Sequence, residues 1–104
     1  MTDTSTYKGM WERYEELKRL YERMENDAYD DGATLPQYAG SEKLAKLVND
    51  LDRLLDASSG LANESDRRKL QAATIAMLYP VELALADARL FECDQAAAFE
   101  DYCS

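Results

Sequence analysis

Apolar side chains between residues 6 and 29 recur at alternating spacings of three and four, which is the pattern of one helix face. The row consists of Tyr7, Met10, Tyr14, Leu17, Tyr21, Met24 and Ala28, with Trp11 and Leu20 beside it. The opposite face carries Lys8, Glu12, Glu15, Glu16, Arg19, Glu22 and Arg23. This pattern predicts an amphipathic helix that begins at a cap among residues 4–6 and ends near Tyr29 or Asp30.

The next two segments are predicted to be a loop and a second helix. Residues 31–40 contain Gly32, Pro36 and Gly40, which are typical of a loop. We expect Leu35 and Tyr38 to hold this loop against the end of the bundle. The second helix is predicted to begin after Ser41 as its N-cap and to end at residues 58–60. Its apolar stripe consists of Leu44, Leu47, Val48, Leu51, Leu54 and Leu55.

A third helix is predicted from Glu64 to Tyr79, with Asn63 or Ser65 as its N-cap. Pro80 follows, and a proline inside a helix costs about 3 kcal/mol because it removes a hydrogen bond and clashes with the preceding turn. No glycine or asparagine adjoins it to build a reversing loop, so a kink or short offset is favoured over a tight hairpin. The stretch from residue 81 to about residue 102 is rich in alanine and leucine. We expect it to be buried on more than one side.

Together these patterns predict an all-α fold that forms one domain over residues 1–104. The expected architecture is an antiparallel bundle of three helices with the third kinked or broken at Pro80. The bundle has four helices if Pro80 starts a separate one. No stretch alternates apolar and polar residues long enough to predict a strand.

The formal net charge is −9, and the acidic excess lies in two blocks. Residues 24–42 contain five acidic residues and no basic one, and residues 70–104 contain six acidic residues against Arg89 alone. This acidity disfavours direct contact with nucleic acid or an anionic membrane. It favours a basic partner surface, or serves solubility alone. The two blocks meet at one end of the bundle if the chain only bends at Pro80, and lie at opposite ends if the chain reverses there.

The chain's beginning and its cysteines indicate a cytoplasmic protein. Residues 1–6 have neither basic residues nor an apolar run, so no signal peptide is expected. The longest uncharged apolar stretch, residues 70–81, is twelve residues and too short to cross a bilayer. Cys93 and Cys103 are ten residues apart, which on one helix is too far for a disulfide. We expect both to be free thiols.

No motif for catalysis, cofactor binding or metal binding stands out. The chain has no histidine, the commonest general base and a usual zinc ligand. Residues 27–32 resemble the start of a calcium loop, but Tyr29 and Tyr38 occupy two of the ligand positions. Carboxylates one helical turn apart, such as Glu12 and Glu16, are typical of exposed helix faces. We therefore expect no enzymatic activity, no cofactor and no metal.

The candidate partner-binding residues are the acids of the two blocks and two tyrosines near the first block. They are Glu25, Asp27, Tyr29, Asp30, Asp31, Tyr38, Glu92, Asp94, Glu100 and Asp101. Carboxylates on a rigid bundle can imitate the phosphates that a nucleic-acid-binding surface expects. An aromatic ring beside them can hold lysine or arginine. The expected function is a non-enzymatic protein-binding module that inhibits a partner by occupying its basic nucleic-acid-binding surface. By composition alone, the chain resembles phage-encoded inhibitors of restriction or CRISPR systems as a class.

The alternative hypothesis is a self-associating structural module, a homodimer, that uses the tyrosine and tryptophan stripe of the first helix. Tyr7, Tyr14, Tyr21 and Trp11 offer stiff contact area with polar tips, which is enriched at interfaces. Packing against the chain's own core, with the hydroxyls reaching the surface, is the favoured interpretation of the same spacing. Burial of the three tyrosines distinguishes these interpretations.

Overall fold

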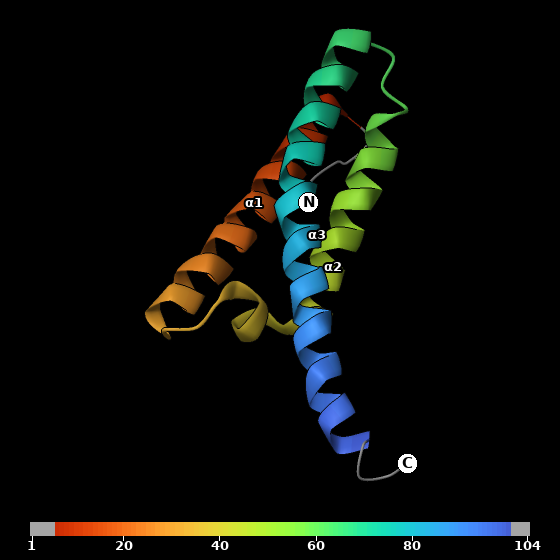
Figure 1. The fold of residues 1–104 in the computed structure, drawn as a ribbon. Helices are drawn as coiled ribbons and strands as arrows, with labels where there is room; N and C mark the ends of the chain where they lie inside the picture. The colour runs from red at the N-terminus through yellow and green to blue at the C-terminus, as the bar shows by residue number, and fades with distance from the viewer. Residues whose placement is uncertain (1–5, 101–104) are drawn as a thin grey trace.

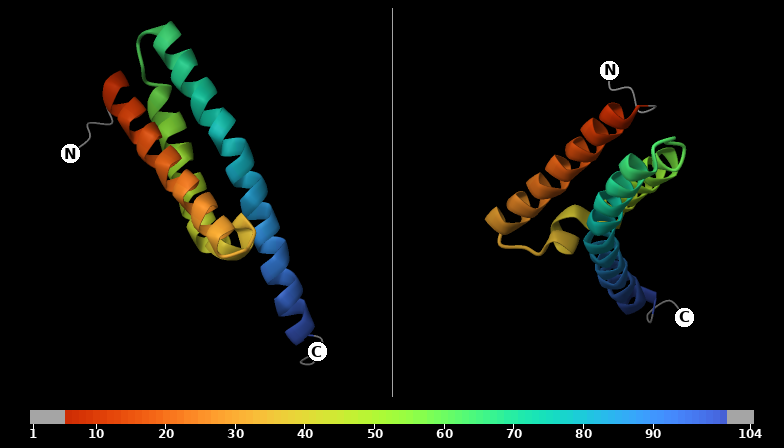
Figure 2. Two further views of the ribbon diagram at one scale, coloured as in Figure 1. Left: turned by 90° about the vertical axis from the view of Figure 1, so that its left-hand side faces the viewer. Right: turned by 90° about the horizontal axis from the view of Figure 1, so that it is seen from above.

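The structure is a computed structural model that describes the backbone of residues 6–100 and the side chains of residues 6–92. These residues form three helices and no strand: α1 spans Tyr7–Asp30, α2 spans Leu35–Ser58 and α3 spans Glu64–Glu100. The chain turns back after α1 and again after α2 (Figure 1). Helix α2 packs against both other helices, most extensively against α3, and α1 lies to one side of this pair (Figure 2). The predicted all-α class is confirmed.

Helix α1 has the bounds and the buried face that its apolar spacing predicted. Thr6 is its N-cap, with the side-chain oxygen accepting a hydrogen bond from the Gly9 N–H at 3.0 Å. The side chains of Met10, Leu17 and Met24 are buried against the core. The charged face of the helix is turned to solvent, as expected for an amphipathic helix.

Helix α2 begins earlier than the sequence predicted. Thr34 is its N-cap: the Thr34 side chain accepts a hydrogen bond from the Gln37 N–H, and the Gln37 side chain accepts one from the Thr34 N–H. Pro36 lies in the first turn, where backbone N–H groups have no acceptor within the helix, so its lack of an N–H breaks no hydrogen bond. The predicted loop is therefore wrong beyond Thr34, because a capping box and a proline in the first turn begin a helix there.

Gly40 interrupts α2 with φ 78° and ψ 165°, a backbone conformation that glycine adopts readily. A short helical turn thus precedes Gly40, and the longer part of α2 resumes at Ser41 and ends at Ser58. The predicted second helix matches this longer part. Leu35 packs against the core, as the sequence led us to expect.

Helix α3 continues through Pro80 as one helix. Asn63, one of the two predicted caps, accepts a hydrogen bond from the Asp66 N–H through its side-chain oxygen at 3.1 Å. The alternative in which Pro80 starts a fourth helix is wrong, because the described residues form a single third helix on both sides of it.

The stretch after Pro80 is less buried than its composition predicted. Val81 and Leu85 are buried against α2, but Leu83 is 51% exposed and Leu90 is 63% exposed. Within the described side chains, this part of α3 is therefore buried on one side only. The expectation of burial on more than one side is wrong for the single chain.

The core lies mainly between α2 and α3, and α1 covers one edge of it. Leucines of α2 at positions 44, 47, 51 and 54 meet Leu70, Met77 and Val81 of α3. Two buried hydroxyls bind carbonyls of their own helix: Thr74 donates to Leu70 at 2.7 Å, and Ser58 donates to Leu55 at 2.6 Å. Among the described side chains, every buried nitrogen or oxygen has a hydrogen-bond partner, which avoids the cost of an unpaired polar group.

Candidate protein-binding surface

The end of α1 presents four carboxylates and a tyrosine to solvent. We call Glu25, Asp27, Tyr29, Asp30 and Asp31 the acidic pole; all five side chains are exposed, and Tyr29 is 84% exposed. The periodicity of the helix explains this arrangement. Met24 and Ala28, four residues apart, face the core, so the acids between and after them face solvent.

The acidic pole is held in place by its buried neighbours and by a defined helix end. Met24 and Ala28 are buried, so the last two turns of α1 are anchored. Gly32 has φ 69°, its N–H bonds the Tyr29 carbonyl at 3.0 Å, and the Ala33 N–H bonds the Ala28 carbonyl at 2.9 Å. This is the Schellman arrangement, which satisfies carbonyls that the helix end leaves open. The carboxylates therefore project from a fixed backbone.

Tyr38 connects the acidic pole to α2. It lies in the short turn before Gly40 and is 37% exposed. The charge of Asp27 is the main cause that raises the pKa of the Tyr38 hydroxyl, and partial burial, Asp31 and a hydrogen bond to Asp27 act in the same direction. Tyr38 is thus placed beside the carboxylates, as the sequence predicted for an aromatic group at this site.

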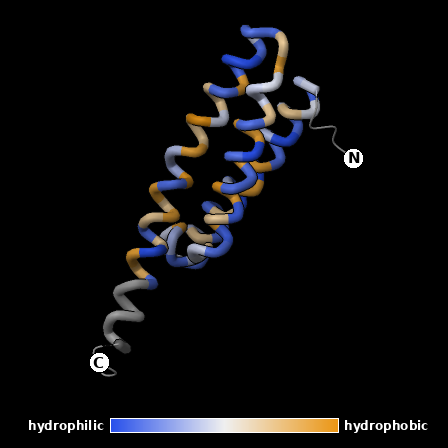
Figure 3. The backbone as a smooth tube through the Cα atoms, turned by 90° about the vertical axis from the view of Figure 1, so that its right-hand side faces the viewer, coloured by the Kyte–Doolittle hydropathy of each residue, from blue (hydrophilic) through white to orange (hydrophobic). Residues whose placement is uncertain are grey.

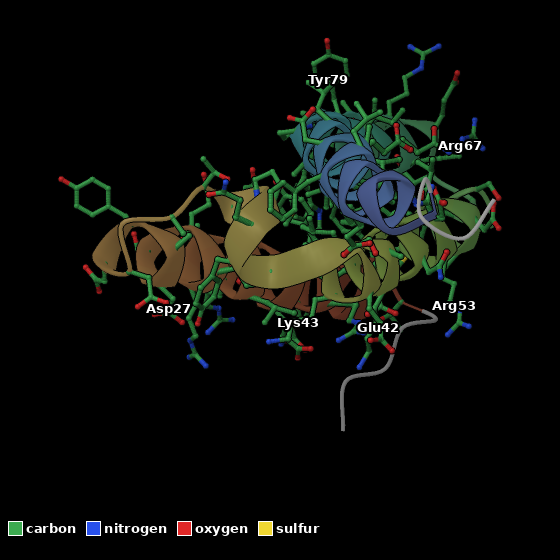
Figure 4. The ribbon with its side chains drawn as sticks, turned by 60° about the horizontal axis from the view of Figure 1, so that its bottom comes forward. Asp27, Glu42, Lys43, Arg53, Arg67 and Tyr79 are labelled. Atoms are coloured by element: carbon green, nitrogen blue, oxygen red, sulfur yellow. The ribbon has the colours of Figure 1, made fainter. Side chains whose placement is uncertain are left out.

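An open groove of about 520 Å³ runs along α1 and α2 next to the pole. Its apolar floor includes Leu17, Met24 and Leu47, and Leu20 adds an exposed apolar group. Its charged residues have both signs: Arg13, Glu16, Arg23, Asp27, Lys43, Lys46 and Asp50. Asp27 and Lys43 lie on the same side of the molecule (Figure 4). Sequence reasoning missed this groove because its basic residues come from two helices whose pairing no motif shows.

The second acidic block is used differently from the first. The Glu92 carboxylate accepts hydrogen bonds from the Ser41 N–H at 3.0 Å and from the Ser41 hydroxyl at 2.5 Å. These two bonds lower the pKa of Glu92 below its usual value, and Arg89 contributes in the same direction. Glu92 therefore caps the longer part of α2 after the Gly40 interruption. Nothing in the sequence signals this contact, because the two residues are far apart along the chain.

The remaining residues of the second block lie at or beyond the limit of the described side chains. Asp94 and Glu100 lie in α3, where only their backbone is described, and Asp101 lies outside the described residues. The C-terminal half of α3 and the end of α1 lie toward the same end of the molecule, with the 31–40 segment between them (Figure 1). Glu92, the first of these four predicted partner-binding residues, already has partners within the chain.

The tyrosines of α1 pack against the core with one edge exposed. Tyr7, Tyr14 and Tyr21 are half-buried, whereas the alternate positions of the same row are fully buried. Trp11 makes edge-to-face contacts with Tyr7 and Tyr14, with ring centroids 6.1 Å and 5.3 Å apart. Burial, followed by the charge of Glu25, raises the pKa of Tyr21. These rings therefore belong to the packing of α1, and only their edges are available to a partner.

Comparison of the chain with protein-family models, with curated proteins and with solved structures finds no match. Among the residues with described side chains, no group of three or more cysteine, aspartate or glutamate side chains is arranged to hold a metal ion. None of the helices in the described part of the chain is both long and apolar enough to span a bilayer.

Proposed function

We propose that this protein is a small, non-enzymatic binding module whose acidic pole docks onto a basic surface of another protein. The observation that carries the proposal is the concentration of exposed carboxylates on an anchored helix end. The four acids lie within seven consecutive positions, and the segment from residue 24 to residue 42 contains no basic residue; Arg23 and Lys43 line the adjoining groove together with Asp27.

The placement of the acidic pole supports a binding role over solubility alone. Acids at this end of a helix lower its stability, and acids placed elsewhere would serve solubility without that cost. Carboxylates near a helix C-terminus oppose the macrodipole by roughly 0.3–1 kcal/mol each when exposed. Asp27 and Asp30 lie in the last turn of α1, and no basic residue lies there to offset them. Tyr29 adds an aromatic ring that is free to stack on lysine or arginine. A partner with a basic surface would offset the unfavourable carboxylates at the helix end and would also contact the Tyr29 ring.

The partner that fits best is a protein whose basic surface normally holds nucleic acid. Carboxylates fixed along a helix end can occupy the positions of phosphates and block that surface. The proposed role is thus inhibition in the cytoplasm, of the type seen as a class in phage proteins that act on restriction or CRISPR systems. Asp94, Glu100 and Asp101 extend the acidic surface in this proposal, and Tyr38 supports it from α2. The proposal takes the three helices to pack antiparallel, with any bend at Pro80 leaving the two blocks at one end.

Salt dependence tests this proposal. The tagged chain is used to isolate partners from its source cell, and each partner's affinity is then measured across a salt series. We expect affinity to fall steeply as salt rises, because screening weakens the charge contacts. An affinity that stays constant from low to high salt contradicts the proposal.

A further inference from the structure

Helix α3 has a second apolar face opposite the one that packs in the core. The buried face includes Leu70, Thr74, Val81 and Ala88. The outer face carries an exposed row, which we call the α3 seam: Ala72, Ala76, Tyr79, Leu83, Ala86 and Leu90. Apolar residues recur along the part of α3 whose side chains are described (Figure 3). The side chain of Tyr79 points away from the other helices (Figure 4).

The seam follows the seven-residue repeat of a coiled coil. Its spacings alternate between four and three over its whole length, which is the pattern that keeps one face against a partner helix. Tyr79, Leu83 and Leu90 are each more than half exposed, and Ile75 beside the seam is 53% exposed. Single exposed apolar residues are ordinary on protein surfaces, but a continuous row about 27 Å long marks an interaction site.

The residues that flank the seam indicate which partner covers it. One flank carries Glu82 and Arg89, seven residues apart, and the other carries Pro80 and Asp87. In an antiparallel pair of identical helices, like flanks face each other, so Glu82 of each copy lies opposite Arg89 of the other. In a parallel pair, the two different flanks face each other. Glu82 of each copy then lies opposite Asp87 of the other, and both contacts are repulsive. The flanking charges thus complement a second copy of this chain in one orientation only.

The side chains of the seam are also complementary in that orientation. With Glu82 opposite Arg89, Leu83 of one copy faces Ala86 of the other, and Tyr79 faces Leu90. The two central layers thus pair a large residue with a small one, and the two outer layers pair two large apolar residues. Glu82, Ala86 and Arg89 also line a groove of about 370 Å³ toward α2, where Ala45, Val48 and Asn49 form the other side.

We propose that the protein forms a two-fold symmetric dimer in which the α3 seams of two copies pack antiparallel. A two-fold contact uses the same patch on both chains, and the α3 seam is complementary to itself in this way. Tyr79 of the seam and the groove residues Asp27 and Lys43 lie on opposite sides of the molecule (Figure 4). The dimer is therefore compatible with the acidic pole but does not depend on it.

The mass of the full chain in solution tests the dimer. Sedimentation across a dilution series should show a dimer that dissociates into single chains. Each copy carries a net charge of −9, so added salt should strengthen the association by screening repulsion. This salt response is opposite to that expected for a basic partner, so failure of one proposal is distinguishable from failure of the other. A single-chain mass at the highest soluble concentration and at high salt overturns the dimer.

Substitution of one seam residue tests the location of the contact. We expect Leu83→Glu to abolish the dimer while circular dichroism still shows the helical fold, because this side chain is half exposed in the single chain. Leu20→Glu is the matched control: this side chain is 44% exposed on α1, away from the seam, and should leave the dimer intact. A dimer that survives Leu83→Glu overturns the assignment of the seam.

Charge exchange tests the orientation. In the antiparallel dimer, Glu82→Arg or Arg89→Glu alone places like charges opposite each other at two symmetric positions. We expect each to weaken the dimer about tenfold. The double substitution should restore the wild-type affinity. If Glu82→Arg instead strengthens association, Asp87 faces this position and the antiparallel arrangement is wrong. Glu12→Arg, on the exposed face of α1, controls for the change in net charge.

Discussion

At the scale of single residues, the contact between Glu92 and Ser41 joins the outer part of α3 to the interruption in α2. Gly40 removes the regular continuation of the helix, so the Ser41 N–H needs an acceptor from elsewhere. The Glu92 carboxylate supplies it; a side-chain carbon at position 40 would lie 3.7 Å from this carboxylate, an ordinary contact, so glycine is favoured there by its φ of 78° and not by lack of space. One acidic residue that the sequence assigned to a partner thus has a structural role.

This contact predicts a pH dependence of stability. The pKa of Glu92 is lowered in the folded chain, so its stabilisation is present above the ordinary glutamate pKa and is lost as pH falls through the lowered value. We expect Glu92→Gln to lower the melting temperature at neutral pH. The difference from the wild type should shrink in acid, where the wild-type carboxyl is also protonated. A difference that is constant with pH contradicts a role for the charged carboxylate.

Gly32 gives a second prediction at this scale, because its φ of 69° disfavours any residue with a Cβ. No atom lies within 4 Å of an added Cβ, so the cost comes from the backbone alone. We expect Gly32→Ala to lower the free energy of unfolding by about 1 kcal/mol, measured by urea denaturation. Gly60→Ala is the matched control without positive φ and should cost less. Equal costs for the two substitutions contradict this explanation.

At the scale of elements, the sequence predicted helices wherever apolar periodicity and capping signals were strong. Both bounds of α1 and the start of α3 follow from Thr6, Asn63 and the apolar spacing. The prediction failed at the start of α2. Gly32, Pro36 and Gly40 indicated a loop, whereas the capping box of Thr34 and Gln37 begins a helix there. Proline and glycine interrupt a helix according to their position within it, and that position depends on where the helix begins.

Pro80 provides the test at this scale. It lies inside α3 and has no N–H for the Ala76 carbonyl one turn earlier. We expect Pro80→Ala to raise the free energy of unfolding by about 1–3 kcal/mol, measured by urea denaturation, because alanine restores this hydrogen bond and removes the steric clash. Ala76→Gly lies one turn away and should instead lower the free energy of unfolding by about 1 kcal/mol, because glycine is less favourable than alanine inside a helix. A loss of stability in Pro80→Ala would mean that the packing of α3 requires proline.

At the scale of the whole molecule, two features could not be predicted from the sequence. The alanine and leucine content of α3 indicated burial, but only the fold shows that one face meets α2 while the α3 seam remains exposed. The charge blocks were visible in the sequence, but their use was not: the acidic pole projects into solvent, while Glu92 bonds to Ser41. Tertiary contacts between residues distant in sequence decide both features.

The most direct test of the proposed function neutralises the acidic pole. The test variant combines Glu25→Gln, Asp27→Asn, Asp30→Asn and Asp31→Asn. The matched control combines Glu12→Gln, Glu15→Gln, Glu22→Gln and Asp52→Asn, which removes four exposed acids elsewhere on the molecule. Removing acids from the C-terminal turns of α1 relieves the macrodipole, so the test variant is expected to remain folded.

The measurement is the affinity of each variant for the partner that the wild-type chain retains. We expect the pole variant to bind about 10- to 100-fold more weakly than the wild type, because four charge contacts are lost. The control should bind within about threefold of the wild type, since screened charges away from a contact contribute little. If the pole variant binds as tightly as the control, the acidic pole is not the binding surface and the proposed function is contradicted.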